Sequence, residues 1–369
     1  MDSSEKEIGQ AGLLERFRKS WFPPAAVVGA FAAFVAAAFR TRPAPRTAVQ
    51  NPAPRNPDAG RRTSDVGREL PILQGNKPAR PLDREYSQSA VLGGRGSAHP
   101  FQRSLAGIAV GTADRIYALG DGQIRVFDAT GSLAAAWYVS ENALCLTVAP
   151  DGRVCVGALG RVDVYDVKGV RIAGFAVGEA KQPAAVTAVK VFRQEILVAD
   201  ADARLIRRYD LGGKQLGLIG DKSKTGSFML PNRWLDFDID SKGIIRATDT
   251  GRHLMTAWTL DGTPVGSFGR FGMSDPADFV GCCNPVNLAL TPDGKIVTAE
   301  KMVARVKVFE ADGKLLAVIG PEHFDQSCTH IPLAVDSRGR ILAGDPVQRQ
   351  VKIFSPVAGA VKRMEQERS

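Results

Sequence analysis

Acidic residues at repeated positions are the first feature of this sequence that could carry chemistry. Each follows a short apolar run, and in the last four copies a basic residue comes three to five positions later. The acids are Asp121, Asp200, Asp249, Glu300 and Asp345, and the basic residues are Arg204, Arg252, Arg305 and Arg349. Such side chains can recognise a charged partner or hold a cation. An acid that accepts backbone N–H groups of its own turn, with arginine pairing across repeats, would give the same pattern.

Histidines and cysteines form a second group of candidate ligands. All four histidines and three of the cysteines fall between the apolar runs, at His99, His253, His323, His330, Cys282, Cys283 and Cys328. If the folded body is exported, a disulfide from Cys282 or Cys283 to Cys328 is our leading interpretation. The alternatives are free buried thiols, or a metal or cofactor site that also uses His323 and His330, because thiolate and imidazole groups would converge there.

The number and spacing of the cysteines narrow the choice of protein class. Five cysteines are too few for a disulfide scaffold, the odd number leaves one thiol unpaired within the chain, and there is no Cys-x-x-Cys motif of a zinc module. Cys145 and Cys155 belong to one expected hairpin, whose turn would pair Cys145 nearer position 157. We therefore interpret both as small core residues.

Motifs of familiar enzymes are missing from the sequence. It contains no Gly-x-Ser-x-Gly elbow, no His-Glu-x-x-His helix and no glycine-rich phosphate loop ahead of a helix. The chain is therefore more readily explained as a binding protein than as an enzyme.

The elements that must position these residues come from a unit repeated six times. Each copy has three short apolar strands joined by tight turns, then a fourth strand and a variable loop, most clearly in residues 185–220 and 285–320. An aromatic residue ends the third strand and a glycine follows it in every copy. The aromatic residues are Phe127, Tyr165, Tyr209, Trp258, Phe309 and Phe354, and the glycines are Gly131, Gly169, Gly213, Gly262, Gly313 and Gly359. A four-strand period repeated six times predicts an all-β fold, a six-bladed β-propeller, in which each blade buries its neighbours' faces.

Several copies match one another in register and resemble the NHL repeat. The strings "LVADADARLIRRYDLGGK", "RATDTGRHLMTAWTLDGT" and "VTAEKMVARVKVFEADGK" carry its apolar pair, acidic residue, short polar turn, arginine, aromatic strand and Asp-x-x-Gly. The second copy lacks the acid, and the fifth has Glu300 in its place. The resemblance covers about residues 105–355. It implies a six-bladed propeller that usually serves as a protein- or RNA-binding surface and is occasionally an enzyme, such as a metal-dependent peptide-amidating lyase.

In a propeller, the loops after second strands and after fourth strands share one face. This rule places the acids, the histidines and the long loop with Cys282 and Cys283 on a common rim, where an insertion can add function to a rigid scaffold. We expect this face to bind a protein or peptide, with charged recognition by Arg252, Glu300, Lys301 and Arg305. The alternative is a metal-dependent hydrolase or lyase that holds Ca²⁺ or Zn²⁺ at the channel mouth; we assign no cofactor and no catalytic residue.

The first eighty residues have a different composition. Trp21 to Phe39 is a 19-residue stretch without charge, flanked by basic residues, and this predicts a transmembrane signal anchor or a cleaved signal peptide. The eight prolines between Arg42 and Pro81 predict a disordered spacer. Residues 1–82 also hold 13 Lys/Arg against 7 Asp/Glu, so only +3 of the net charge of +9 belongs to the body, and nucleic-acid binding is disfavoured.

These patterns give a linear organisation of the chain. We expect a polar segment over residues 1–20, the apolar helix over 21–39, a linker over 40–83, a monomeric propeller over 84–360 and a tail over 361–369. The propeller is expected to be membrane-anchored and extracytoplasmic, or exported if the leader is cleaved. Its last blade could be completed by residues 86–93, which we favour, or by residues 360–365.

Overall fold

The computed structural model describes residues 85–179, 181–223 and 226–358. The predictions for the apolar helix over 21–39, the linker and the C-terminal tail lie outside these residues. Within them, no helix has the length and apolar character needed to cross a membrane. Apart from two short 3₁₀ turns, Thr112–Asp114 and Pro321–His323, the regular structure of this part of the chain is β-strand.

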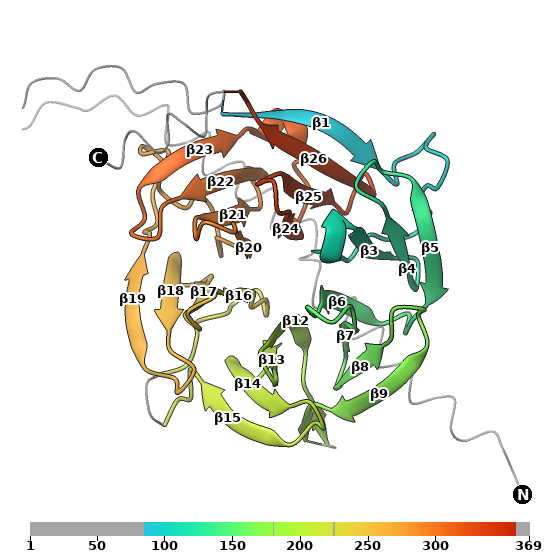
Figure 1. The fold of residues 1–369 in the computed structure, drawn as a ribbon. Helices are drawn as coiled ribbons and strands as arrows, with labels where there is room; N and C mark the ends of the chain where they lie inside the picture. The colour runs from blue at the N-terminus through green and yellow to red at the C-terminus, as the bar shows by residue number, and fades with distance from the viewer. Residues whose placement is uncertain (1–84, 180, 224–225, 359–369) are drawn as a thin grey trace, which may run out of the picture. The chain divides into compact units, whose positions relative to one another are not determined.

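Six four-stranded antiparallel sheets form the blades of a propeller (Figure 1), which confirms the predicted architecture. Blade one contains β2 (Gly107–Val110), β3 (Ile116–Gly120), β4 (Gln123–Phe127) and β5 (Leu133–Tyr138). Blade two contains β6 (Ala143–Val148), β7 (Val154–Ala158), β8 (Arg161–Tyr165) and β9 (Arg171–Ala176). Blade three contains β12 (Val186–Phe192), β13 (Glu195–Asp200), β14 (Leu205–Asp210) and β15 (Gln215–Ile219), and the short ribbon of β10 (Gly178–Glu179) and β11 (Gln182–Pro183) precedes it.

The second half of the ring repeats this plan. Blade four contains β16 (Phe237–Ile239), β17 (Ile245–Asp249), β18 (Leu254–Trp258) and β19 (Pro264–Phe268). Blade five contains β20 (Asn287–Leu290), β21 (Ile296–Glu300), β22 (Arg305–Phe309) and β23 (Leu315–Ile319). Blade six contains β24 (Leu333–Val335), β25 (Ile341–Asp345), β26 (Gln350–Pro356) and β1 (Tyr86–Leu92). The first strand of each blade is innermost, and these strands contact one another around the whole ring, so the ring is closed.

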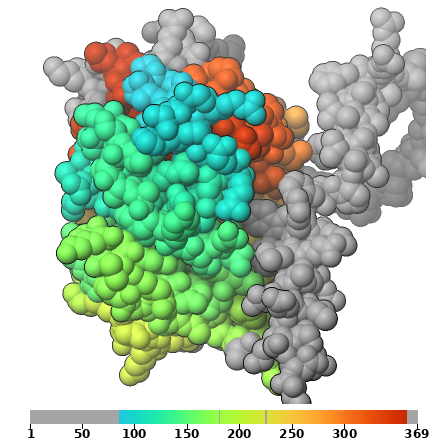
Figure 2. All heavy atoms as spheres, turned by 90° about the vertical axis from the view of Figure 1, so that its right-hand side faces the viewer, coloured from blue at the N-terminus to red at the C-terminus, as the bar shows by residue number. Residues whose placement is uncertain are grey.

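The N-terminal strand β1 completes blade six. It pairs antiparallel with β26, with Tyr86 opposite Pro356 and Leu92 opposite Val351. Figure 2 shows this N-terminal segment packed beside the C-terminal residues at the edge of the ring. The favoured prediction for closure by residues 86–93 is confirmed; the alternative strand over 360–365 lies outside the described residues. The two ends of the described body are therefore held together by main-chain pairing within one sheet.

The apolar core lies between neighbouring blades. One buried cluster joins Leu342 and Ile353 of blade six to Ile108 and Phe127 of blade one. Another joins Cys145, Cys155 and Val162 of blade two to Val186 and Val198 of blade three. Cys145 stands opposite Gly157, which confirms the predicted register, and both cysteines are core residues. No blade could bury this surface alone, so the ring folds as a cooperative unit.

The glycine that recurs after the third strand has a packing reason. In blade three, Gly213 has a φ of +86°, and a Cβ on it would lie 2.5 Å from the Cβ of Phe175 in blade two. Gly169 and Gly313 approach Trp137 and Phe268 of their preceding blades in the same way. The glycine therefore serves both the left-handed turn and the close contact with the neighbouring blade.

Candidate functional site

The five acids at the ends of second strands, which we call the rim carboxylates, accept hydrogen bonds from backbone N–H groups. Asp121 accepts from the N–H groups of residues 102, 103 and 104 at 2.7–2.9 Å. Asp249 accepts from Met229 at 3.0 Å, Glu300 from Val280 at 3.0 Å and Asp345 from Asp325 at 2.8 Å. In each of these four blades the donor belongs to the loop that leads into the blade. These carboxylates therefore fasten the incoming loops to the sheets.

The blades without such a contact have short or independently paired incoming loops. Asp200 accepts instead from Ala203 in its own turn at 3.0 Å, and the incoming loop of blade three is paired by β10 and β11. Blade two has no rim acid, and only four residues separate it from blade one. The missing acid of the second copy thus coincides with the loop that needs no fastening.

Cations pair with the rim carboxylates within each blade rather than across blades. Arg252 lies 2.5 Å from Asp249 and Arg305 lies 3.1 Å from Glu300, as the spacing suggested. Asp200 pairs with Arg207 at 2.8 Å rather than with Arg204.

Asp345 likewise pairs with Lys352 at 3.6 Å rather than with Arg349. Arg204 and Arg349 occupy left-handed turn positions, with φ of +59° and +57°. The strand residues that follow them, and not the turn residues, point back to the acids.

Glu300 is, with Asp345, one of the two most enclosed rim carboxylates. Its side chain is 1% exposed, and its second cation, Lys307, lies 2.6 Å away and has no exposed surface. The Lys307 ammonium also donates to the carbonyl oxygens of Pro276, Ala277 and Asp278 at 2.8–3.2 Å. Burial lowers the pKa of Lys307 to about 8, against the opposing effect of the Glu300 charge. This lysine was not predicted, although the position two residues before the closing aromatic is basic in four copies, at Arg125, Arg207, Lys307 and Lys352. Each of these cations lies beside the rim carboxylate of its own blade.

These contacts hold residues 269–284, which we call the insertion, in one conformation. Arg270 pairs with Asp278 at 2.6 Å, and the Phe279 N–H donates to the Arg270 carbonyl at 2.9 Å. At its end, the Asn284 amide bonds both the N–H and the carbonyl of Lys301 at 2.9 and 3.0 Å. The tip nevertheless presents Phe271 and Met273, which are 59% and 75% exposed. An internally braced loop therefore displays large apolar side chains to solvent.

The charged residues expected to recognise a partner differ in accessibility. Glu300 is enclosed and Arg305 retains 14% side-chain exposure, so both serve mainly the insertion. Arg252 keeps 44% exposure beside Asp249, and Lys301 is half-buried with no ion-pair partner among the residues the structure describes. Lys301 and Arg252 are thus the members of this group that a partner could reach.

The cysteines of this face do not form the expected disulfide in the structure. Cys282, Cys283 and Cys328 are free thiols. The Cys328 thiol donates to a carboxylate oxygen of Asp345 at 3.4 Å, whereas the sulfur atoms of Cys282 and Cys283 lie 3.0 Å apart. The three thiols are therefore divided between blade six and the insertion.

The histidines lie in separate surroundings. The ring of His253 packs on Phe271, that of His323 on Phe354 and that of His330 on Trp234, with centroids 5.1, 5.1 and 4.9 Å apart. The carbonyl of His99 accepts from Arg125. Burial lowers the pKa of His330 to about 4, so its ring is neutral at pH 7. In the described part of the chain, no three His, Cys, Asp or Glu side chains gather as a metal site would require.

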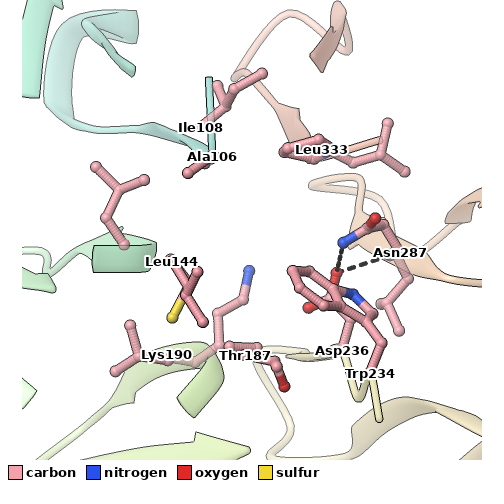
Figure 3. A pocket seen from close by; sticks show the side chains of 16 residues that line it. Ala106, Ile108, Leu144, Thr187, Lys190, Trp234, Asp236, Asn287 and Leu333 are labelled. Atoms are coloured by element: carbon pink, nitrogen blue, oxygen red, sulfur yellow. Dashed lines mark hydrogen bonds between the residues drawn. The ribbon is translucent and has the colours of Figure 1, made fainter. Parts of the chain in front are cut away.

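The wall of the central channel holds a polar group that the sequence analysis did not identify. Figure 3 shows Lys190, Asp236, Trp234 and Asn287 around one space, a small cavity of about 40 Å³. We call these four residues the channel site. They come from the innermost strands of blades three and five and from the residues just before β16. Only the rule that first strands line the channel could have pointed to them.

Asp236 is the buried acid of the channel site. One of its carboxylate oxygens accepts from the Asn287 side chain at 2.8 Å and from the Leu288 N–H at 3.1 Å. Burial raises the pKa of Asp236 to about 6, although the Lys190 charge opposes this. The Lys190 ammonium pairs with Asp238 at 3.1 Å. The channel wall thus links blades three, four and five by polar contacts and contains a carboxyl that can change protonation near neutral pH.

Comparisons with known proteins identify the fold and nothing finer. No family model and no curated protein matches the sequence, so the likeness to NHL repeats remains a resemblance. Among solved structures, a chain of the mitotic checkpoint complex has a TM-score of 0.52 at 12% identity over 78% of this chain and 98% of that one.

Two further solved structures are similar to this chain to the same degree. The WD40 β-propeller domain of Doa1 has a TM-score of 0.51 at 16% identity, over 76% of this chain and 93% of that one. A streptogramin B lyase has a TM-score of 0.52 at 10% identity, over 75% and 100%. A chain of a protein complex, a WD40 domain and a lyase are similar to this chain to nearly the same degree, so these likenesses show a propeller and do not choose between the two functions.

Proposed function

We propose that this propeller is a protein- or peptide-binding module that recognises an apolar segment of its partner on the rim of blades four and five. The surface consists of four exposed side chains, which we call the rim patch: Met229, Phe271, Met273 and Met302, with exposures of 45%, 59%, 75% and 48%. The main support for this proposal is that buried ion pairs brace the insertion, whereas its tip exposes apolar side chains.

Contacts of intervening residues connect parts of the rim patch. The Gly251 N–H donates to the Met229 carbonyl at 2.8 Å, and two residues further on His253 packs on Phe271. Met302 lies against Gly281 of the insertion. Methionine side chains adapt to different apolar surfaces, and a rigid loop has little conformational entropy to lose on binding. The patch therefore has the composition and the rigidity of a recognition surface.

The charge beside the rim patch favours a particular kind of partner. Lys301 precedes Met302 directly and has no ion-pair partner in the described residues. Arg252 remains partly exposed nearby in the turn that contacts Met229. A partner segment with aromatic or aliphatic anchors next to an acidic residue would satisfy both features. The membrane anchor over residues 21–39 and an extracytoplasmic location remain predictions that would place this module near a membrane.

Peptide selection tests the proposal. Peptides from a random display library are selected on the full-length chain, and their affinities are measured by fluorescence polarisation. Selected peptides should share apolar anchors beside an acid, and Phe271→Ser with Met273→Ser should weaken binding about 10- to 100-fold.

The matched control is Val167→Ser with Val170→Ser. These valines are 64% and 57% exposed but lie in the turn between β8 and β9, on the opposite face. Equal loss of affinity in both double variants, or selected peptides with no apolar anchor, would contradict the proposal. Metal analysis of the same preparation addresses the alternative: stoichiometric Ca or Zn that survives dialysis would favour the hydrolase or lyase.

A further inference from the structure

The two adjacent thiols of the insertion are arranged differently from neighbouring side chains in an extended chain. Successive side chains on a strand point to opposite sides, but Cys283 has a left-handed φ of +62° and the two sulfur atoms lie 3.0 Å apart. Cys282 is exposed and Cys283 is buried. The remaining cysteine of this face, Cys328, is engaged with Asp345 in blade six. The insertion therefore presents one accessible thiol with a second thiol directly behind it.

We propose that Cys282 and Cys283 form a redox-active vicinal dithiol that reacts with low-molecular-weight disulfides. The Cys282 thiolate attacks one sulfur of the external disulfide, whose other half leaves as a thiolate, and a mixed disulfide forms on Cys282. Cys283 then loses its proton to solvent and attacks the Cys282 sulfur, which releases the second thiolate. In total the protein loses two electrons and two protons, and the external disulfide is reduced to two thiols.

Accessibility fixes the order of these steps. Only Cys282 has the exposure that a first attack on an external molecule requires. Burial, together with the neighbouring Cys282, raises the pKa of Cys283 to about 12, which makes Cys283 the poorer of the two for a first attack. Cys282 is therefore the attacking residue and Cys283 the resolving one.

The covalent geometry of adjacent residues makes the product a reversible bond. A trans peptide fixes the Cα atoms of neighbours about 3.8 Å apart, below the range of about 4.4–6.8 Å that ordinary disulfides span. A disulfide closed under such strain is more easily reduced than a structural one. The next residue, Asn284, bonds both main-chain groups of Lys301. A change in the oxidation state of the dithiol would therefore affect the main chain at the base of the rim patch.

Peptide mapping of the oxidised full-length chain tests the proposal. The chain is treated with oxidised glutathione, its free thiols are alkylated, and it is digested with trypsin. Cys282 and Cys283 fall together in residues 271–295, whereas Cys328 falls in residues 315–338. The peptide 271–295 should lose two hydrogens, escape alkylation and regain both thiols with mild reductant. A link between the two peptides, a disulfide between chains, or unchanged thiols would overturn the proposal.

Single serine variants separate the two roles. Cys283→Ser should accumulate glutathione on Cys282, Cys282→Ser should take up none at this peptide, and Cys328→Ser should behave as wild type. Phenylarsine oxide gives a second readout that needs no oxidation: it should be retained one to one by the wild type, with two S–As bonds formed and water released. Either serine variant at 282 or 283 should lose it on dialysis. Retention of the arsenical by both of these variants would also overturn the proposal.

Discussion

Glu300 on the rim and Asp236 in the channel wall are both buried carboxylates, but their surroundings differ. Glu300 has two cations in direct contact, Lys307 and Arg305, and one backbone donor. Asp236 has only amide donors in direct contact, and its nearest cationic influence, Lys190, is paired with Asp238. The rim acid is thus neutralised by fixed charges, whereas the channel acid is stabilised by dipoles and has a raised pKa.

This difference separates the carboxylates that stabilise loops from the carboxyl that can change its protonation state. A buried acid with matched cations holds its loop through fixed charges, and removing one partner leaves the other charge buried and unpaired. A buried acid without a cation in contact has a raised pKa, so it becomes protonated and neutral more easily. The rim carboxylates therefore act as fasteners that leave partner recognition to exposed side chains, and the channel site is where pH should alter the protein.

Glu300→Ala should give the largest effect. It leaves the Lys307 ammonium buried without its carboxylate and should lower the free energy of unfolding by about 3–5 kcal/mol. Urea denaturation of the full chain measures this. The matched control is Glu141→Ala, which removes an exposed pair with Arg103 and should change little. Similar losses in the two variants would mean that the rim pair is not a fastener.

The second largest effect should be a pH dependence of stability that comes from Asp236. Because its pKa is raised to about 6, the folded state binds a proton more tightly than the unfolded state between pH 4 and 6, and stability falls as pH rises through this window. Relative to Asp236→Asn, the wild type should lose about 2–3 kcal/mol between pH 4 and pH 7. Denaturation series at several pH values measure the difference. Parallel curves for the two proteins would contradict the assignment.

Lys190→Met should have a smaller effect, on the pKa of Asp236. Removing the Lys190 charge takes away an influence that lowers the pKa of Asp236, so that pKa should rise further, by about one unit. Carboxyl titration followed by NMR reports the shift directly. Lys214→Met is the control, because this lysine lies in the outer turn of blade three. A downward shift in Lys190→Met would reverse the electrostatic account.

Arg252→Ala should have the smallest effect. Its side chain is 44% exposed, so its pair with Asp249 is screened by water and should contribute less than about 1 kcal/mol. Asp249→Ala should cost more, because it leaves the Met229 N–H without its acceptor. Thermal unfolding of both variants checks the order. If Arg252→Ala were less stable than Asp249→Ala, the ion pair rather than the backbone contact would hold this loop.

The periodic sequence carried most information about the fold. The recurrence of Phe127, Tyr165 and their equivalents, each followed by a glycine, predicted six blades, and in the structure Gly169, Gly213 and Gly313 contact the preceding blade. The YSQSAVL segment predicted the closing strand because it resembles other fourth strands. These features could be predicted because a repeat shows the same physical requirement several times.

The site was less predictable, because its channel residues occur once and its recurring basic position was not recognised. Asp236 stands at a position where the repeat carries no special signal, whereas Lys307 is equivalent to Arg125, Arg207 and Lys352, which also pair with rim carboxylates. The partners of Asp200 and Asp345 were misjudged because sequence distance was used, whereas strand direction selected Arg207 and Lys352. Cys328 was assigned to Cys282 or Cys283 by shared face alone, whereas in the structure all three are free thiols and Cys328 contacts Asp345.

The central claim is that the rim carboxylates fasten loops while the rim patch recognises the partner. Calorimetry with a selected peptide, combined with thermal unfolding, tests it on two variants of the full chain. Asp345→Asn should bind with unchanged affinity and unfold at a lower temperature, because its acceptor contacts with the Asp325 loop are weakened. Phe271→Ser with Met273→Ser should lose binding and keep its unfolding temperature. The opposite result, lost binding in a folded Asp345→Asn and full binding in the patch variant, would contradict the account.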